Sequence, residues 1–135
     1  MKIFEKELKV ATSKRVEFID VTAEINKIVD ESKISNGVCY IFVPHTTAAI
    51  TINENADPDV ITDIINTINS IVPHKGNYFH LEGNSDAHIK SSLFGATLSV
   101  FVNNKKLKLG TWQGIYFCEF DGPRHRKVWI KVIGE

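Results

Sequence analysis

A short segment near the middle of the chain concentrates side chains that can do chemistry. It runs from His80 to Ser92, reads HLEGNSDAHIKSS, and contains two imidazoles, two carboxylates, an amine and serine hydroxyls. A third candidate histidine, His45, stands apart in the run VPHTT. Imidazole is the common general acid or base near neutral pH and a common zinc ligand, so these residues predict a three-histidine site.

The spacing of His80 and His88 decides whether the two rings can meet. If His80 closes a loop and His88 opens a helix, Gly83 and Asn84 let the backbone turn back, so that both rings face one pocket with His45. Three neutral imidazoles and a water would suit zinc or a similar metal. Carboxylates that could orient the rings, or act as a base, are Glu54, Glu82 and Asp86. The alternative is that the three histidines are separate surface residues.

The same segment also predicts phosphate binding. A helix that begins near Ser85 exposes N–H groups that attract anions, and Lys90, Ser91 and Ser92 would add donors. Arg124 and Arg126, in the run DGPRHR, could supply guanidinium groups from a neighbouring turn. A solvated helix face and a charged hairpin explain the same residues about as well.

A second unusual run, Gly110-Thr-Trp-Gln113-Gly114, places an aromatic ring and an amide between two glycines. Glycine in a strand lets another group approach the backbone closely. That group is either a ligand ring stacked on Trp112 or, more often, another part of the protein. The sequence contains no GxSxG, Walker A, GxGxxG or HExxH pattern, so acid–base or metal assistance is favoured over nucleophilic catalysis.

Three helices are expected to position these side chains. The first helix is expected to begin near Thr22, which would cap it, and to stop at Asn36-Gly37. The clearest has Asp57 as N-cap, Pro58 at the first helical position and Pro73 after its end, with an apolar stripe. The stripe comprises Val60, Ile61, Ile64, Ile65, Ile68, Ile71 and Val72. The third begins with Ser85 or Asp86 as its cap and ends at Gly95.

The remaining chain predicts strands, because apolar residues alternate or run together between turn signals. The expected strands are 14–21, 38–43, 48–52, two alternating runs on either side of Asn103-Asn104, 112–120 and 127–133. This pattern indicates an α+β fold with a dominant antiparallel, sandwich-like sheet core. Residues 1–135 are expected to form a single compact domain.

Composition excludes several classes of function. Sixteen basic and sixteen acidic residues cancel, so nothing favours nucleic-acid binding. No apolar run approaches the length of a membrane span, and the charged N-terminus is unlike a signal peptide, which predicts a cytoplasmic protein. Cys39 and Cys118 lie in apolar runs without a CxxC spacing, so we expect reduced core residues rather than a disulfide or a reactive thiol.

Several blocks of sequence resemble the YjbQ family, whose members are often labelled secondary thiamine-phosphate synthase. They are HTTAA at 45–49, NENADPDV at 53–60, AHIKSSL at 87–93, LGTWQGI at 109–115 and Glu119. These blocks follow the family's order over nearly the whole chain. One departure is that the segment before His88 is shorter and less acidic than in many bacterial members, which weakens a site for magnesium because that ion prefers oxygen ligands.

The resemblance implies a homotrimer with pockets near the subunit interfaces. It implies that His45, His80 and His88 match the family's histidines, and that a divalent metal, zinc or magnesium, or a phosphate-like anion binds there. It implies four neighbours of the histidines: Glu54, Lys90, Gln113 and Arg124.

Three functions follow from the residues and the resemblance together. The first is a transferase that joins a hydroxymethylpyrimidine pyrophosphate to a thiazole phosphate. The second is a metal-assisted hydrolase or phosphatase with a three-histidine site. The third is a trimeric protein that binds a small phosphorylated metabolite without converting it.

Overall fold

The computed structural model describes all 135 residues and contains two antiparallel sheets and three helices. The five-stranded sheet has the order β1 (Lys2–Ala11), β8 (His125–Gly134), β3 (Asn36–Phe42), β5 (Thr97–Asn103) and β6 (Lys106–Leu107). The three-stranded sheet has the order β2 (Glu17–Asp20), β7 (Gln113–Glu119) and β4 (Ala48–Glu54). The expected α+β fold is confirmed.

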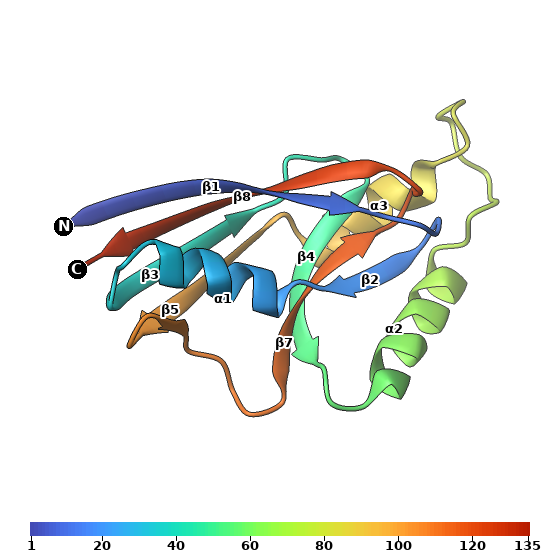
Figure 1. Cartoon of the computed structure of the whole chain (residues 1–135). Helices are drawn as coiled ribbons and strands as arrows, with labels where there is room; N and C mark the ends of the chain where they lie inside the picture. The colour runs from blue at the N-terminus through green and yellow to red at the C-terminus, as the bar shows by residue number, and fades with distance from the viewer.

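The main core lies between the two sheets and helix α1 (Thr22–Glu31), which covers them at one end (Figure 1). Alternating side chains of β3, β7 and β8 fill it, among them Ile41, Phe117 and Ile130. A smaller apolar cluster of Ala49, Ala87, Cys118 and Phe120 lies under helix α3 (Ser85–Phe94). Both cysteines are buried and free, as expected, and burial raises the pKa of the Cys39 thiol to about 12.

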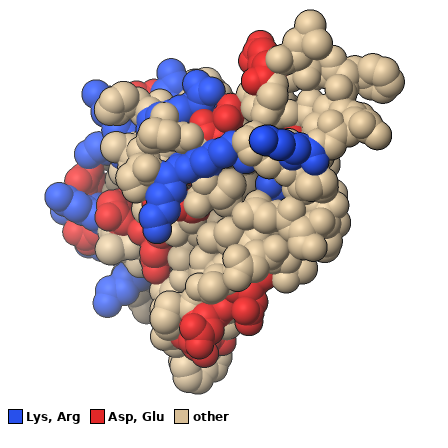
Figure 2. All heavy atoms as spheres, turned by 90° about the vertical axis from the view of Figure 1, so that its right-hand side faces the viewer, with Lys and Arg blue, Asp and Glu red and all other residues tan.

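Helix α2 (Pro58–Ile71) begins as the sequence predicts but packs differently. The Asp57 carboxylate accepts a hydrogen bond from the N–H of Asp59 at 2.9 Å, and Pro58 opens the helix. Its isoleucine stripe is poorly covered, however, since only Ile68 is buried within the helix and Ile71 is 68% exposed. The side of the molecule that carries α2 shows a wide area without Lys, Arg, Asp or Glu (Figure 2).

Three local predictions are corrected. Helix α1 ends at Glu31, and Lys33, two residues later, takes a positive φ. The predicted stop at Asn36-Gly37 is wrong, because Gly37 lies inside β3. A Cβ at Gly37 would meet the carbonyl oxygen of Ile133 at 2.0 Å, so this glycine permits close approach of strands instead of stopping a helix. Thr22 is not the cap of α1, because its hydroxyl donates to Asp20, which also accepts the N–H of Thr22.

Strand β1 was not expected, because its first residues are mostly charged. It pairs with β8 along its whole length, from Lys2 opposite Gly134 to Ala11 opposite His125. It is an edge strand, and charged side chains at an edge discourage pairing with other chains. No helix of this protein is both long enough and apolar enough to cross a membrane.

Candidate functional site

A polar cleft of about 480 Å³ lies where three connecting segments meet helix α3 and strand β8, at one end of the two sheets. No hydrophobic residue lines it. The β3–β4 loop contributes Pro44, His45, Thr46 and Thr47. The loop before α3 contributes His80, Glu82 and Asn84, and the first turn of α3 contributes His88. The β7–β8 turn and β8 contribute Asp121, Arg124 and Arg126. The three histidines named from the sequence therefore line one cleft.

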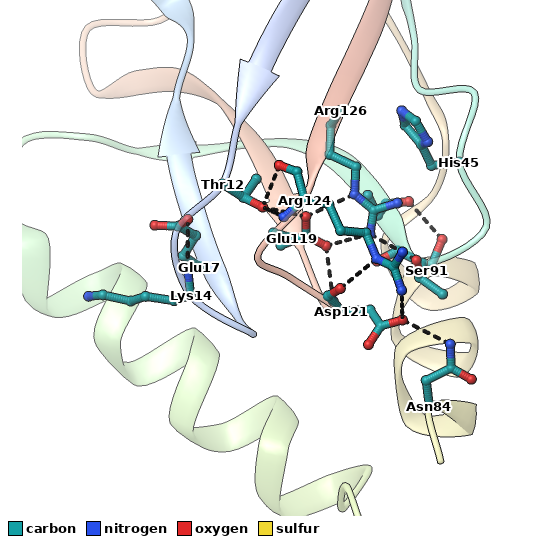
Figure 3. Close-up of polar contacts among 12 residues, drawn as sticks. Thr12, Lys14, Glu17, His45, Asn84, Ser91, Glu119, Asp121, Arg124 and Arg126 are labelled. Atoms are coloured by element: carbon teal, nitrogen blue, oxygen red, sulfur yellow. Dashed lines mark hydrogen bonds and ion pairs between the residues drawn. The ribbon is translucent and has the colours of Figure 1, made fainter. Parts of the chain in front are cut away.

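A buried ion pair forms one wall of the cleft. Arg126 donates from Nε to Glu119 Oε2 at 2.8 Å and from Nη2 to Glu119 Oε1 and to the Thr47 hydroxyl (Figure 3). Burial alone would raise the pKa of the Glu119 carboxyl, but hydrogen bonds from Arg126, the Asp121 N–H and Thr12 lower it below its ordinary value. The pair holds the guanidinium of Arg126 in one orientation.

The β7–β8 turn presents the second arginine. The Thr12 hydroxyl accepts the N–H of Arg124 at 2.8 Å, and Gly122 has no room for a side chain because a Cβ there would meet the Lys14 carbonyl oxygen. Arg124 donates from Nε to the Asp121 carbonyl and from Nη2 to Asp121 Oδ2 at 3.0 Å. Neither Arg124 nor Arg126 uses its Nη1 in a hydrogen bond within the protein. The two Nη1 groups are therefore donors that an anion in the cleft can use.

His45 is fixed in one tautomer. Its Nε2 accepts the N–H of Lys127 at 3.0 Å, so in the neutral ring the proton is on Nδ1. Burial, and next the positive charge of Arg126, lower the pKa of His45 below its ordinary value. The ring is therefore neutral at physiological pH.

The other two histidine rings contact each other. The His80 and His88 ring centroids lie 5.4 Å apart with the edge of one facing the other, and His80 Nε2 lies 3.7 Å from a Glu82 oxygen. No three His, Cys, Asp or Glu side chains are arranged to hold a metal ion together. As placed, the histidines do not fit a three-histidine metal centre, because the Nε2 of His45 is already occupied by Lys127.

Lys90 and Ser91 do not reach the cleft. Lys90 is 1% exposed and donates to Asp86 and to Asn69, each at 2.8 Å. Ser91 donates to the Ala48 carbonyl at 2.7 Å. Asp86 and Lys90 lie four residues apart on the helix face opposite His88, so Lys90 is turned away from the cleft. Neither Lys90 nor Ser91 is placed as the predicted phosphate ligand in the cleft, because both are paired within the protein.

Glu54 and Gln113 are also outside the cleft. They face each other across β4 and β7, at the opposite strand ends from Ala48 and Glu119. Six residues of strand correspond to roughly 20 Å. Gln113 accepts the N–H of Gly110, and Glu54 accepts the N–H of Asp57. Gly114 is indeed a point of close approach, but by the side chain of Asn55.

Five residues that line the cleft were not named from the sequence as site residues: Pro44, Thr46, Thr47, Asn84 and Asp121. For Asn84 the sequence did offer a signal, because asparagine favours the N-cap and Asn84 stands just before the helix that begins at Ser85. Nothing in the sequence indicated that Thr47 would meet Arg126.

Comparison with known proteins identifies the relatives of this chain. The family model described as "UPF0047 protein YjbQ-like" matches residues 6–135. The chain belongs to the YjbQ/UPF0047 family. A UPF0047 protein of Methanocaldococcus jannaschii is 54% identical over 93% of this chain and 91% of its own length, and the UPF0047 protein YugU of Bacillus subtilis is 52% identical over 96% and 98%.

Solved structures of YjbQ/UPF0047 proteins share the fold. A family protein from Clostridium acetobutylicum is 56% identical, with a TM-score of 0.93 over 95% of this chain and 99% of that one. A protein from Sulfolobus solfataricus, described as of unknown function, is 35% identical, with a TM-score of 0.95 over 99% of both chains.

Proposed function

We propose that this YjbQ-family chain is a transferase of the thiamine-phosphate synthase type, which acts on small phosphorylated substrates in the polar cleft. The observation that carries the proposal is the pair of guanidinium groups of Arg124 and Arg126, each held by a carboxylate and each with a free Nη1. Planar guanidinium groups suit phosphate oxygens, and their fixed orientation requires little reorganisation when an anion binds.

The reaction requires that a leaving group be stabilised. The bond between the pyrimidine methylene carbon and the pyrophosphate oxygen breaks, the thiazole nitrogen forms a new bond to that carbon, and pyrophosphate leaves with the electron pair. In the proposed mechanism Arg124 and Arg126 bind the pyrophosphate, and His80 and His88 donate hydrogen bonds to its oxygens. These residues favour departure because negative charge develops on the group that they contact.

The test is product formation by purified protein from a host without thiamine synthesis. Wild-type protein is incubated with the two precursors, with and without divalent metals, and thiamine phosphate and pyrophosphate are measured. We expect product, and a loss of at least tenfold in kcat/KM for Arg124→Met. Lys9→Met is the matched control, because it removes one positive charge from the exposed part of β1 and should retain full activity. Absence of product under all metal conditions would refute the proposal.

A second candidate is a metal-assisted hydrolase or phosphatase, which is favoured by the presence of all three histidines in one cleft. It requires His45 to release Lys127 before it can bind a metal. Metal analysis of the purified protein, repeated with His45→Ala and His88→Ala, tests it. No stoichiometric metal, or uptake that is unchanged in both variants, would exclude this function. Tight binding of a phosphorylated compound without turnover would instead favour the non-catalytic binding protein.

We also propose that the protein is a homotrimer. Its support is apolar surface that the single chain leaves uncovered: the stripe of α2, with Ile71 exposed, and Phe79 and Leu81, which are 100% and 98% exposed beside His80. Sedimentation equilibrium should give three times the chain mass, and a monomer at micromolar concentration would contradict the proposal. The cytoplasmic location stays a prediction.

A further inference from the structure

A second hollow adjoins the polar cleft at the wall formed by its two contacting histidines. It has a volume of about 400 Å³ and lies between the α2–α3 loop and the exposed side of α3. Its lining residues are Asn77, Tyr78, Phe79 and His80 of the loop and Ser85, His88 and Ile89 of the helix. His80 and His88 also line the polar cleft, and their rings pack edge to face. The two hollows therefore meet at this pair of rings.

The second hollow differs from the cleft in its chemistry. The cleft has two arginines and no hydrophobic residue, whereas the hollow has Tyr78, Phe79 and Ile89 and no Lys, Arg, Asp or Glu. Phe79 is 100% exposed and Ile89 is 40% exposed, so a ligand can reach both side chains. Apolar and aromatic walls with a few polar groups are typical of ligand pockets, and aromatic side chains pack favourably against other rings.

Two hydrogen bonds hold the loop that forms this hollow. The Tyr78 hydroxyl donates to the Pro73 carbonyl at 2.6 Å, and Nε2 of His74 donates to the Gly83 carbonyl at 3.0 Å. The second bond joins the two ends of the loop, which stands out from the body of the molecule (Figure 1). The Tyr78 ring is therefore held in place before a ligand binds, which lowers the entropy cost of binding.

We infer that this hollow is a ring subsite, which binds the aromatic ring of a phosphorylated ligand while Arg124 and Arg126 hold the phosphate in the cleft. The inference rests on the proposed binding of phosphorylated compounds and adds the place and the contacts of the ring. The direction of binding follows from charge, because a phosphate in a hollow without lysine or arginine would be poorly stabilised. Aromatic phosphate esters are therefore selected over small alkyl esters.

The shared histidines lie at the junction of the two parts of such a ligand. A ligand that spans both hollows passes His80 and His88, so the bond between its ring portion and its phosphate lies beside their rings. At that place a hydrogen-bond donor can assist the departure of phosphate or pyrophosphate.

The experiment measures binding to the whole protein by calorimetry. The ligands are benzyl and phenethyl phosphate, ethyl phosphate as the ester without a ring, and sulfate as the bare anion. Wild type should bind at least one aromatic ester about tenfold more tightly than ethyl phosphate, because the ring leaves water. In Ile89→Asn this ratio should fall to about threefold or less, because a polar side chain replaces an apolar wall of the ring subsite.

The matched control is Leu93→Asn on the same helix. Leu93 is 63% exposed and lines neither hollow, so its replacement makes a similar chemical change outside the ring subsite and should retain the wild-type ratio. Thermal unfolding shows whether each variant is folded. If Ile89→Asn is not folded, Tyr78→Leu, which removes the aromatic ring from the loop, replaces it in the comparison.

Each outcome supports or overturns the ring subsite. Aromatic esters that bind no more tightly than ethyl phosphate overturn it, and so does a preference that is unchanged in the folded variant or lost equally in Leu93→Asn. Sulfate binding then shows that the anion site itself stands. If neither sulfate nor any ester binds, the proposed function fails and the inference fails with it. Aromatic preference without formation of thiamine phosphate would refute the synthase activity alone.

Discussion

Helix α3 separates two groups of charged side chains that use the same residue types and differ in how completely their hydrogen bonds are satisfied. On one face, Asp86 receives both terminal nitrogens of Arg15, at 2.8 and 3.1 Å, and Lys90 at 2.8 Å. We call these three residues the α3 ion cluster. On the other side, the guanidinium groups of Arg124 and Arg126 line the cleft, and each keeps a free Nη1.

The difference distinguishes structural charge from charge available to a ligand. The carboxylate oxygens of Asp86 have cation partners on both sides, and Lys90 also donates to Asn69, so the cluster links α3 to α2 and to the β1–β2 loop. Burial alone would raise the pKa of Asp86, but Arg15 and Lys90 lower it to about 2. Residue type does not separate the two roles, because each group contains arginine and aspartate.

The largest effect is expected from Asp86→Asn. Removal of one partner from a buried ion pair leaves Lys90 and Arg15 without their anion, so the free energy of unfolding should fall by about 3–5 kcal/mol. Urea denaturation measures it. The control is Asp63→Asn on the exposed part of α2, which should change stability by less than about 0.5 kcal/mol. Equal effects of the two substitutions would show that the α3 ion cluster is not structural.

Acid should reveal the same cluster in the unmodified protein. Because the folded pKa of Asp86 is below its unfolded value, the stabilisation is fully present above about pH 4 and is lost as the pH falls through about 2. The shift corresponds to about 2 kcal/mol. Denaturation measured from pH 5 to pH 2 should show this loss in wild type and a smaller loss in Asp86→Asn; parallel curves would contradict the assignment.

The arginines of the cleft should separate binding from stability. Arg124→Met should weaken sulfate binding about tenfold or more with less than about 1 kcal/mol change in stability, because its pair with Asp121 is half exposed. Arg126→Met should weaken sulfate binding and also lower stability, since Glu119 is buried and would be left unpaired. Calorimetry and urea denaturation of the same samples test this. Stability losses of equal size would remove the distinction.

The smallest effect concerns His45. Its ring should titrate below the ordinary histidine value in NMR, and replacing Arg126 with glutamine should raise the pKa, because a nearby positive charge is removed. The resonances of exposed His125 serve as the internal control. An unchanged His45 titration in a folded Arg126→Gln variant would show that the two groups do not interact.

Local signals predicted much of the fold. Asp57 and Pro58 marked the start of α2, and alternating residues in β5 and β8 marked strands, because these features depend on neighbours in sequence. β1 was missed, since a charged edge strand lacks the apolar pattern and is stabilised by β8, more than a hundred residues away.

The site was predicted in part. The sequence by itself predicted that His45, His80 and His88 meet in one pocket and that Arg124 and Arg126 could join them, because dense polar and imidazole groups beside glycine favour a site; it left open that the histidines are separate surface residues. Only the tertiary structure decided which polar residues line the cleft and which are paired in the interior. Lys90 and Arg124 are both basic residues beside predicted turns or helix starts, yet Lys90 meets Asp86 in the interior and Arg124 opens on the cleft. The reason is physical: a charged group becomes available to a ligand only where folding leaves its hydrogen bonds unfilled, and its partners come from distant parts of the chain.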